Sequence, residues 1–347
     1  MPRSALGSIE LEYDTVGSSN DPAILLVMGL GAQLIHWPDD FCRMLADGGF
    51  QVIRFDNRDA GLSTKLDGVE IDFLALVAAA LEGREVPDAP YDLSDMADDA
   101  FGVLDALGIG HAHVVGASLG GMIAQTMAIE RPDRLMSLTS MMSATGTREV
   151  AHIPDDSLTL LLAPVPTERE EYLDYSAQYG IWCSKKYFDP QLAREHAVIA
   201  YDRCHYPDGS GRQIAAMLAS GDRELSLAEL TVPTLVIHGR DDRLLLPALG
   251  MRTAEVIPAS NFLFLSDMGH DLPEALWPVV VDSILSHVRN STPVEAISQS
   301  IDPHPLKLEI VHSQPDLTDG IRRGGGGGGG TRRRRPPKFT FRPERRG

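Results

Sequence analysis

The feature that most limits how this chain can fold is a regular alternation of short apolar runs and helical patterns. Residues 23–28 and 51–55 are apolar-rich runs of strand length, whereas residues 93–107 repeat apolar side chains at helical spacing. When strands and helices alternate, right-handed crossovers place successive strands in parallel. The sequence therefore predicts an α/β fold in which helices cover both faces of a mostly parallel sheet.

Residues 146–228 interrupt this alternation, because they contain helical patterns and no convincing strand. We predict that they form a helical cap, inserted between two strands of a core made of residues 1–145 and 229–290. A second, smaller insertion is expected at residues 73–81, an unbroken apolar run with the character of a helix.

The last part of the chain, residues 291–347, has no sustained apolar period and is predicted to be disordered. It contains a polyglycine run at 324–330 and an arginine run at 332–335. Residues 321–347 hold ten Lys or Arg and one acidic residue, so they carry +9; the whole chain carries −18, and the remainder therefore −27. Such an acidic body repels nucleic acids and anionic membranes, so only the tail can bind either. We favour a solvated extension over a nucleic-acid or anionic-surface tether, and over a clamp on the acidic body.

Composition places the chain among ordinary globular proteins, with 43% hydrophobic and 23% charged residues in a length of 347. The longest apolar run is too short to cross a bilayer, which takes about 20 residues as a helix. Residues 1–10 lack the basic and apolar blocks of a signal peptide. Three cysteines, Cys42, Cys183 and Cys204, are widely spaced and odd in number, which indicates reduced thiols. We therefore expect a cytoplasmic protein without a membrane span.

The strongest chemical motif is a G-x-S-x-G sequence formed by Gly116, Ser118 and Gly120. A strand pattern precedes it and a helix of small residues follows it. Glycines at these positions allow a sharp strand-to-helix turn that lifts the serine hydroxyl above the sheet. The alternative is a glycine-rich turn with a serine that caps the helix. The strand–turn–helix context favours a nucleophile at Ser118.

A serine hydroxyl needs a base, and the base in turn needs an acid that orients it. His270 follows the last predicted strand and precedes the last predicted helix. Catalytic groups of such sheets lie in loops at the carboxyl ends of the strands. Two adjacent carboxylates, Asp241 and Asp242, follow the preceding strand. Since neighbouring residues point to opposite sides, only one of them can face His270. We choose Asp242 as the acid and keep Asp241 as the alternative.

A second glycine turn, at residues 28–33, directly follows the strand at 23–28. Its unpaired backbone N–H groups can stabilise an oxyanion together with the N–H of the residue after the nucleophile. We assign this oxyanion hole to the N–H groups of Leu30 and Leu119. Trp37, just beyond the turn, is predicted to contact the substrate.

Together these segments resemble the alpha/beta-hydrolase superfamily over about residues 5–290. Residues 37–41 and 54–63 resemble its aclacinomycin methylesterase-like branch of serine esterases, and the nucleophile region through residue 125 is also similar to enol-lactonases of aromatic degradation. The resemblance implies hydrolysis without a cofactor, with Ser118 as nucleophile, Asp242 as acid and His270 as base. Haloalkane dehalogenases and epoxide hydrolases of this superfamily carry an aspartate as the nucleophile. Ser118 at this position therefore favours acyl transfer.

The sequence contains no cluster of histidines and cysteines at metal-ligand spacing, and no phosphate-binding glycine loop after a strand. We therefore expect neither a metal nor a nucleotide.

These patterns predict a serine hydrolase that cleaves a carboxylic ester of a small, mostly apolar substrate through an acyl-serine intermediate. A lactonase, a carbon–carbon hydrolase or a cofactor-free perhydrolase would share the same residues, since pocket shape separates these activities. From other classes, a non-catalytic binding protein and a nucleic-acid or anionic-surface binder acting through the tail are alternatives. Natural substrate and oligomeric state stay open.

Overall fold

The computed structural model describes residues 3–6, 9–84, 89–147 and 153–291. In this part of the chain, eight strands form one sheet in the order β1-β2-β4-β3-β5-β6-β7-β8. The strands are β1 (Arg3–Leu6), β2 (Ile9–Val16), β3 (Ala23–Val27), β4 (Gln51–Phe55), β5 (Ala112–Ala117), β6 (Leu135–Met141), β7 (Thr234–Gly239) and β8 (Asn261–Leu265). The predicted tail at 291–347 lies, except for its first residue, outside the described residues.

Among the described strands, the pairs from β4 to β8 are parallel, whereas β1 with β2 and β2 with β4 pair in antiparallel fashion. Every residue of β3, β4, β5 and β7 is buried. Strands covered on both faces read as continuous apolar runs rather than as an alternation, which is the pattern that the sequence shows here.

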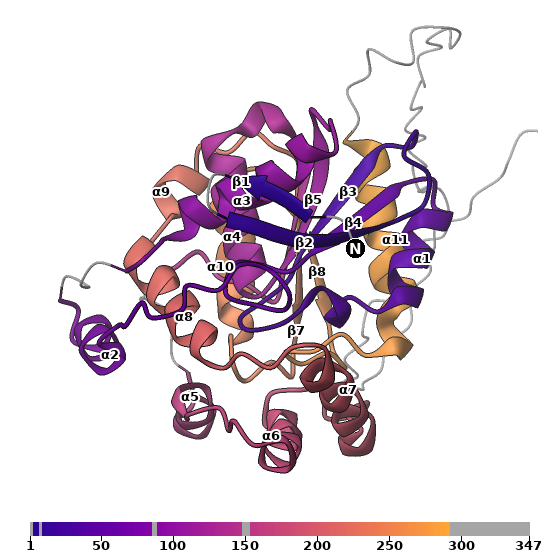
Figure 1. The fold of residues 1–347 in the computed structure, drawn as a ribbon. Coiled ribbons are helices and arrows are strands. Elements are labelled where there is room, and N and C mark those ends of the chain that lie inside the picture. Colours follow the sequence, from indigo (N-terminus) through magenta and orange to yellow (C-terminus); the bar gives the residue numbers. More distant parts are fainter. Residues whose placement is uncertain (1–2, 7–8, 85–88, 148–152, 292–347) are drawn as a thin grey trace, which may run out of the picture. The chain divides into compact units, whose positions relative to one another are not determined.

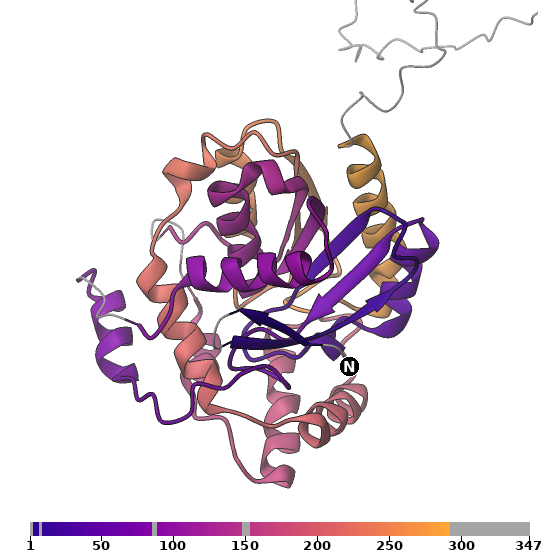
Figure 2. The ribbon, with the colours of Figure 1, turned by 45° about the horizontal axis from the view of Figure 1, so that its top comes forward.

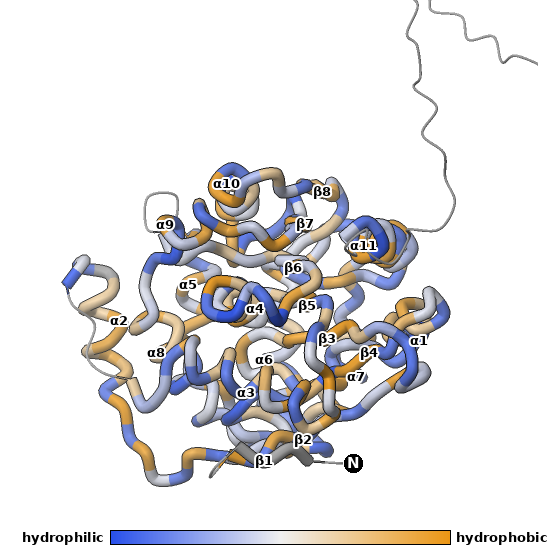
Figure 3. Tube along the Cα trace, turned by 90° about the horizontal axis from the view of Figure 1, so that it is seen from above, coloured by the Kyte–Doolittle hydropathy of each residue, from blue (hydrophilic) through white to orange (hydrophobic). Residues whose placement is uncertain are grey.

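Helices cover both faces of the sheet, as Figures 2 and 3 show. On one face, α1 (Asp39–Asp47) and α11 (Trp277–Asn290) enclose a core cluster with β3, β5 and β7. On the other face, α3 (Leu93–Ala106), α4 (Leu119–Glu130) and α10 (Pro247–Val256) enclose a second cluster. The predicted α/β layering is therefore confirmed.

The chain between β6 and β7 is helical, and its described residues contain no strand. It forms α5 (Asp155–Leu162), α6 (Arg169–Ser176), the 3-10 helix η3 (Ala177–Ile181), α7 (Pro190–Arg203), α8 (Asp208–Ser220) and α9 (Glu224–Leu227). Figure 1 shows α5, α6 and α7 together beyond one end of the strands. We call the segment 153–228 the cap; its status as a separate domain stays a prediction.

Two shorter predictions can be compared directly with the fold. The apolar helix expected at 73–81 is α2 (Phe73–Leu81). The side chain of Asp72 caps its N-terminus by accepting a hydrogen bond from the N–H of Ala75. The last predicted helix, after His270, is α11, and a 3-10 turn, η4 (Glu274–Leu276), precedes it. Pro278 occupies the first turn of α11, where a missing N–H costs nothing. None of the described helices is both long and apolar enough to cross a membrane.

Candidate active site

Ser118 lies at the sharp turn between β5 and α4, with φ 57° and ψ −122°. A non-glycine residue adopts this conformation only when its surroundings enforce it. Two close backbone contacts do so: a Cβ on Gly116 would lie 2.1 Å from the carbonyl oxygen of Gly120, and one on Gly120 would lie 2.1 Å from that of Val27. The motif glycines are therefore required by backbone packing.

The hydroxyl of Ser118 faces His270 rather than the helix that follows it. Its Oγ lies 2.9 Å from Nε2 of His270, and its side chain makes no capping hydrogen bond to α4. The alternative role as a helix-capping serine is therefore not what the structure shows.

His270 lies in the loop that follows β8, and both its backbone and its imidazole ring are held by hydrogen bonds. Its backbone N–H donates to the carbonyl of Trp182 at 2.7 Å, so the cap anchors this loop. Its Nδ1 lies 2.8 Å from Oδ2 of Asp242. Ser118, His270 and Asp242, which are far apart in sequence, thus form one continuous hydrogen-bonded chain.

Asp242 is 1% exposed and occupies the turn after β7. Its Oδ1 accepts hydrogen bonds from the N–H groups of Leu244 and Leu245 at 2.9 and 2.8 Å. Burial alone would raise the pKa of Asp242, but the charge of His270 and hydrogen bonding to His238 and His270 lower it to about 2. The carboxylate therefore stays ionised and fixes the orientation of the His270 ring.

The neighbouring carboxylate of Asp241 points elsewhere. Its Oδ2 accepts a hydrogen bond from the backbone N–H of Lys185 at 3.3 Å, and its Oδ1 lies 3.5 Å from Nζ of the same lysine. Of the two acids left open by the sequence, only Asp242 contacts His270.

The glycine turn after β3, at residues 28–33, lies against the sharp turn at Ser118. A Cβ on Gly29 would lie 3.1 Å from the Cβ of Ser118, so no larger side chain fits there easily. Within the part of the chain that the structure describes, neither the N–H of Leu30 nor that of Leu119 donates to a protein acceptor. Both groups are available to an oxygen atom that develops negative charge above Ser118.

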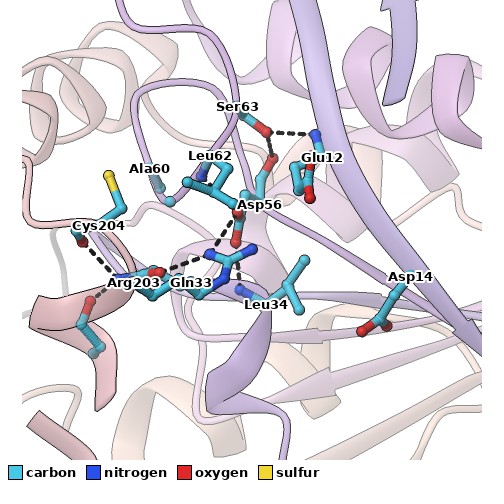
Figure 4. Close-up of polar contacts among 12 residues, drawn as sticks. Glu12, Asp14, Gln33, Leu34, Asp56, Ala60, Leu62, Ser63, Arg203 and Cys204 are labelled. Atoms are coloured by element: carbon cyan, nitrogen blue, oxygen red, sulfur yellow. Dashed lines mark hydrogen bonds and ion pairs between the residues drawn. The ribbon is translucent and has the colours of Figure 1, made fainter. Parts of the chain in front are cut away.

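A buried polar cluster joins the end of this turn to the cap (Figure 4). Arg203, the last residue of α7, lies 2.6 Å from Oε1 of Gln33 and 2.8 Å from Oδ2 of Asp56. Asp56 is fully buried and accepts hydrogen bonds from the N–H groups of Leu34 and Leu62. We call Gln33, Asp56 and Arg203 the Asp56 cluster; Gln33 and Asp56 lie in stretches that the sequence analysis singles out, whereas Arg203 does not.

Trp37, predicted to contact the substrate, is instead a core residue. It is 1% exposed and stacks on Phe41, with 5.7 Å between the ring centroids. The turn directs it inward because the 3-10 helix η1 (Leu34–His36) and α1 pack it between the sheet and α11. Its sequence position beside the turn gave no information on this direction.

The cap also contacts the His270 loop through two residues that sequence reasoning missed. Ser184 donates from its hydroxyl to the carbonyl of Asp267 at 2.7 Å, and from its backbone N–H to Oδ1 of Asp271 at 3.0 Å. Burial raises the pKa of Asp271 to about 6, although hydrogen bonds from Ser184 and Gly269 oppose the shift. No local pattern marks these contacts, because they join segments more than eighty residues apart.

Among the described residues, no group of three or more His, Cys, Asp or Glu side chains is arranged to hold a metal ion. The side chains of Ser118, His270 and Asp242 are engaged with one another.

Comparisons with known proteins agree with this fold. A sequence model for the alpha/beta hydrolase fold matches residues 22–179. The chain is 29% identical over 306 residues to a rhodomycin D methylesterase from a Streptomyces strain, a match that covers 82% of this chain and 96% of the relative. It is 28% identical over 262 residues to a putative carbamate hydrolase from Variovorax paradoxus, covering 75% and 89%.

Solved structures show the same fold. An esterase from Thermogutta terrifontis superposes with a TM-score of 0.65 at 24% identity, covering 84% of this chain and 99% of that one. An enol-lactonase from Burkholderia xenovorans gives 0.59 at 22% identity, covering 84% and 99%. The chain has the alpha/beta hydrolase fold and resembles rhodomycin D methylesterases, as predicted.

Proposed function

We propose that this protein is a serine hydrolase that cleaves a carboxylic ester of a small, mostly apolar substrate through an acyl-serine intermediate. The observation that carries the proposal is the hydrogen-bonded chain from Ser118 through His270 to Asp242. A serine, a histidine and a buried carboxylate in this order make the hydroxyl a nucleophile. The methylesterase relatives support an ester as the bond that is cleaved.

In the first half of the reaction, Oγ of Ser118 attacks the ester carbonyl carbon while Nε2 of His270 takes the hydroxyl proton. The tetrahedral oxyanion accepts hydrogen bonds from the N–H groups of Leu30 and Leu119. One such donor contributes about 3 kcal/mol of transition-state stabilisation. Asp242 stabilises the imidazolium without accepting its proton.

His270 then donates the proton to the departing alkoxide, which leaves as an alcohol and gives an acyl-serine. In the second half, His270 deprotonates a water molecule that attacks the acyl carbon. Collapse of the second oxyanion releases the carboxylic acid and returns the proton to Ser118. Each step uses only groups of this chain, the ester and water.

The cap aromatics do not identify the substrate. Tyr179 stacks on Trp182, with 5.3 Å between ring centroids, in a cluster with Tyr175 and Leu244. These residues hold the cap together, so the proposal of a mostly apolar substrate rests on sequence composition: a body that carries −27 disfavours anionic esters. The three cysteines are unpaired, which supports our further proposal of a cytoplasmic enzyme.

The test is hydrolysis of p-nitrophenyl esters, from acetate to palmitate, by wild type and by Ser118→Ala. We expect turnover by wild type and a loss of kcat on the order of 10⁴-fold or more in the variant. The preferred acyl length would then report the pocket size. Equal activity of both proteins would show that Ser118 is not the nucleophile. If wild type hydrolyses none of these esters, methyl esters and lactones are the next substrates, and inactivity on all of them would overturn the proposal.

A further inference from the structure

The turn that provides the Leu30 N–H contains two glycines and has little stiffness of its own. Gly31 has a φ of +64°, in the region that glycine enters freely. Catalysis by an oxyanion hole requires donors that are fixed to within about 0.5 Å before the reaction begins. Contacts from outside the turn must therefore hold the backbone on either side of Leu30.

Gln213, on α8 of the cap, provides one of these contacts. Its Oε1 accepts a hydrogen bond from the N–H of Gly31 at 2.8 Å, and its Nε2 donates to the carbonyl of Arg58 at 2.8 Å. An N–H can only donate and a carbonyl can only accept, so the two partners fix which end of the amide faces the turn. The Gln213 side chain is 0% exposed, so water does not compete for either bond.

The bond to Gly31 acts directly beside the oxyanion donor. The N–H of Gly31 belongs to the peptide plane that follows Leu30, and fixing this plane restricts the rotation of Leu30 itself. Gln33, at the end of the turn, is also bound to the cap. Its Nε2 donates to the carbonyls of Ala200 and Cys204, both at 2.7 Å. The turn is thus held at two points by cap helices rather than by the sheet alone.

We infer that Gln213 is a positioning residue for the oxyanion hole, through which helix α8 of the cap determines the rate of acyl transfer. This inference rests on the proposed function, because it assigns the Leu30 N–H to an oxyanion. Without the acceptor of Gln213, the Gly31 N–H loses its partner and the Leu30–Gly31 peptide plane can rotate. Such a change weakens the binding of the transition state more than the binding of the ester. It therefore lowers kcat and leaves KM nearly unchanged.

Two substitutions separate the hydrogen bonds from the shape of Gln213. Gln213→Met keeps the length of the side chain and removes both bonds. Gln213→Glu keeps the acceptor; burial favours its neutral form, which can also donate to Arg58. For p-nitrophenyl butyrate we expect Gln213→Met to lower kcat about 10- to 100-fold, because a displaced donor loses part of the roughly 10²- to 10³-fold that a removed donor costs. KM should change by less than about threefold, and Gln213→Glu should recover most of the kcat.

Gln125→Met is the matched control. Gln125 is also 0% exposed, and it bonds Ser140 and Arg223 rather than the turn. Both Met variants should lose similar stability in urea unfolding, but only Gln213→Met should lose kcat. Equal kcat values for the two folded Met variants would overturn the inference.

Amide hydrogen exchange at Gly31 tests the same contact without any substrate. We expect exchange at Gly31 to be at least about tenfold faster in Gln213→Met than in wild type, and close to wild type in Gln213→Glu. Unchanged exchange in Gln213→Met would contradict a positioning role. If wild type and Ser118→Ala have equal esterase activity, the proposed function fails, and the exchange rates still decide whether Gln213 holds the turn.

Discussion

The Oδ2 atom of Asp242 lies 2.8 Å from Nδ1 of His270, whereas both carboxylate oxygens of the adjacent Asp241 contact Lys185. The turn after β7 thus directs two neighbouring carboxylates to different partners, and only one of them reaches the imidazole. The backbone N–H groups of Leu244 and Leu245 hold Asp242 in this orientation.

This difference predicts opposite outcomes for two conservative substitutions. Asp242→Asn should lower kcat on the order of 10⁴-fold, because an amide favours the wrong tautomer of His270 and does not stabilise the imidazolium. Asp241→Asn should change kcat by less than about threefold. Steady-state kinetics with a p-nitrophenyl ester measures both, and a larger loss in Asp241→Asn would reverse our assignment of the acid.

The turn at Ser118 packs closely against β3, so we expect Gly120→Ala to lower the stability of the fold strongly. The added Cβ would lie 2.1 Å from the carbonyl oxygen of Val27, a backbone atom that cannot move without disturbing the sheet. We expect a loss of about 3 kcal/mol or more in the free energy of unfolding, measured with urea. In Gly110→Ala, the control, the new Cβ meets nothing within 4 Å, so its stability should stay within about 0.5 kcal/mol of wild type.

The Asp56 cluster predicts strong coupling between two buried charges. Arg203→Met leaves the fully buried Asp56 carboxylate without its cation, and should cost about 3–5 kcal/mol of unfolding free energy. Adding Asp56→Asn removes the uncompensated charge and should recover part of this loss. A double-mutant cycle measures the coupling; strictly additive effects would show that the pair does not stabilise the junction of cap and turn.

Asp271 predicts a pH-dependent stability. Its pKa is raised to about 6 in the folded protein, whereas an unfolded aspartate titrates near 3.9. Between these two values the folded state binds more protons than the unfolded state, so this group's contribution to stability falls as pH rises through the window.

Asp271→Asn keeps an oxygen acceptor for the N–H groups of Ser184 and Gly269 but cannot ionise. Relative to wild type, its unfolding free energy should increase from pH 4 to pH 7 by up to about 3 kcal/mol, since one pKa unit corresponds to about 1.4 kcal/mol. Urea unfolding at several pH values measures the difference. A difference that does not vary with pH would show that Asp271 titrates normally.

Much of the architecture can be predicted from the sequence because it depends on local properties. Strand-length apolar runs and helical spacing report burial along each segment, and they predicted the parallel sheet, α2 and the helices between β6 and β7. The glycines around Ser118, between a strand pattern and a helix pattern, indicated the sharp turn that the structure shows. Ser118, Asp242 and His270 each follow a strand, β5, β7 and β8, which places all three at the same edge of a parallel sheet, where the structure indeed brings them together.

Other features depend on which distant side chains meet, and no local pattern contains that information. From the sequence we chose Asp242 and kept Asp241 as the alternative, because the direction of each carboxylate is fixed by the turn and by cap residues such as Lys185. It placed Trp37 near the substrate, whereas packing against Phe41 buries it. The contact between Gln213 and Gly31 joins residues 182 positions apart. Local preference thus determined the elements and their order, and tertiary packing alone decided which polar groups hold the oxyanion turn and the histidine in place.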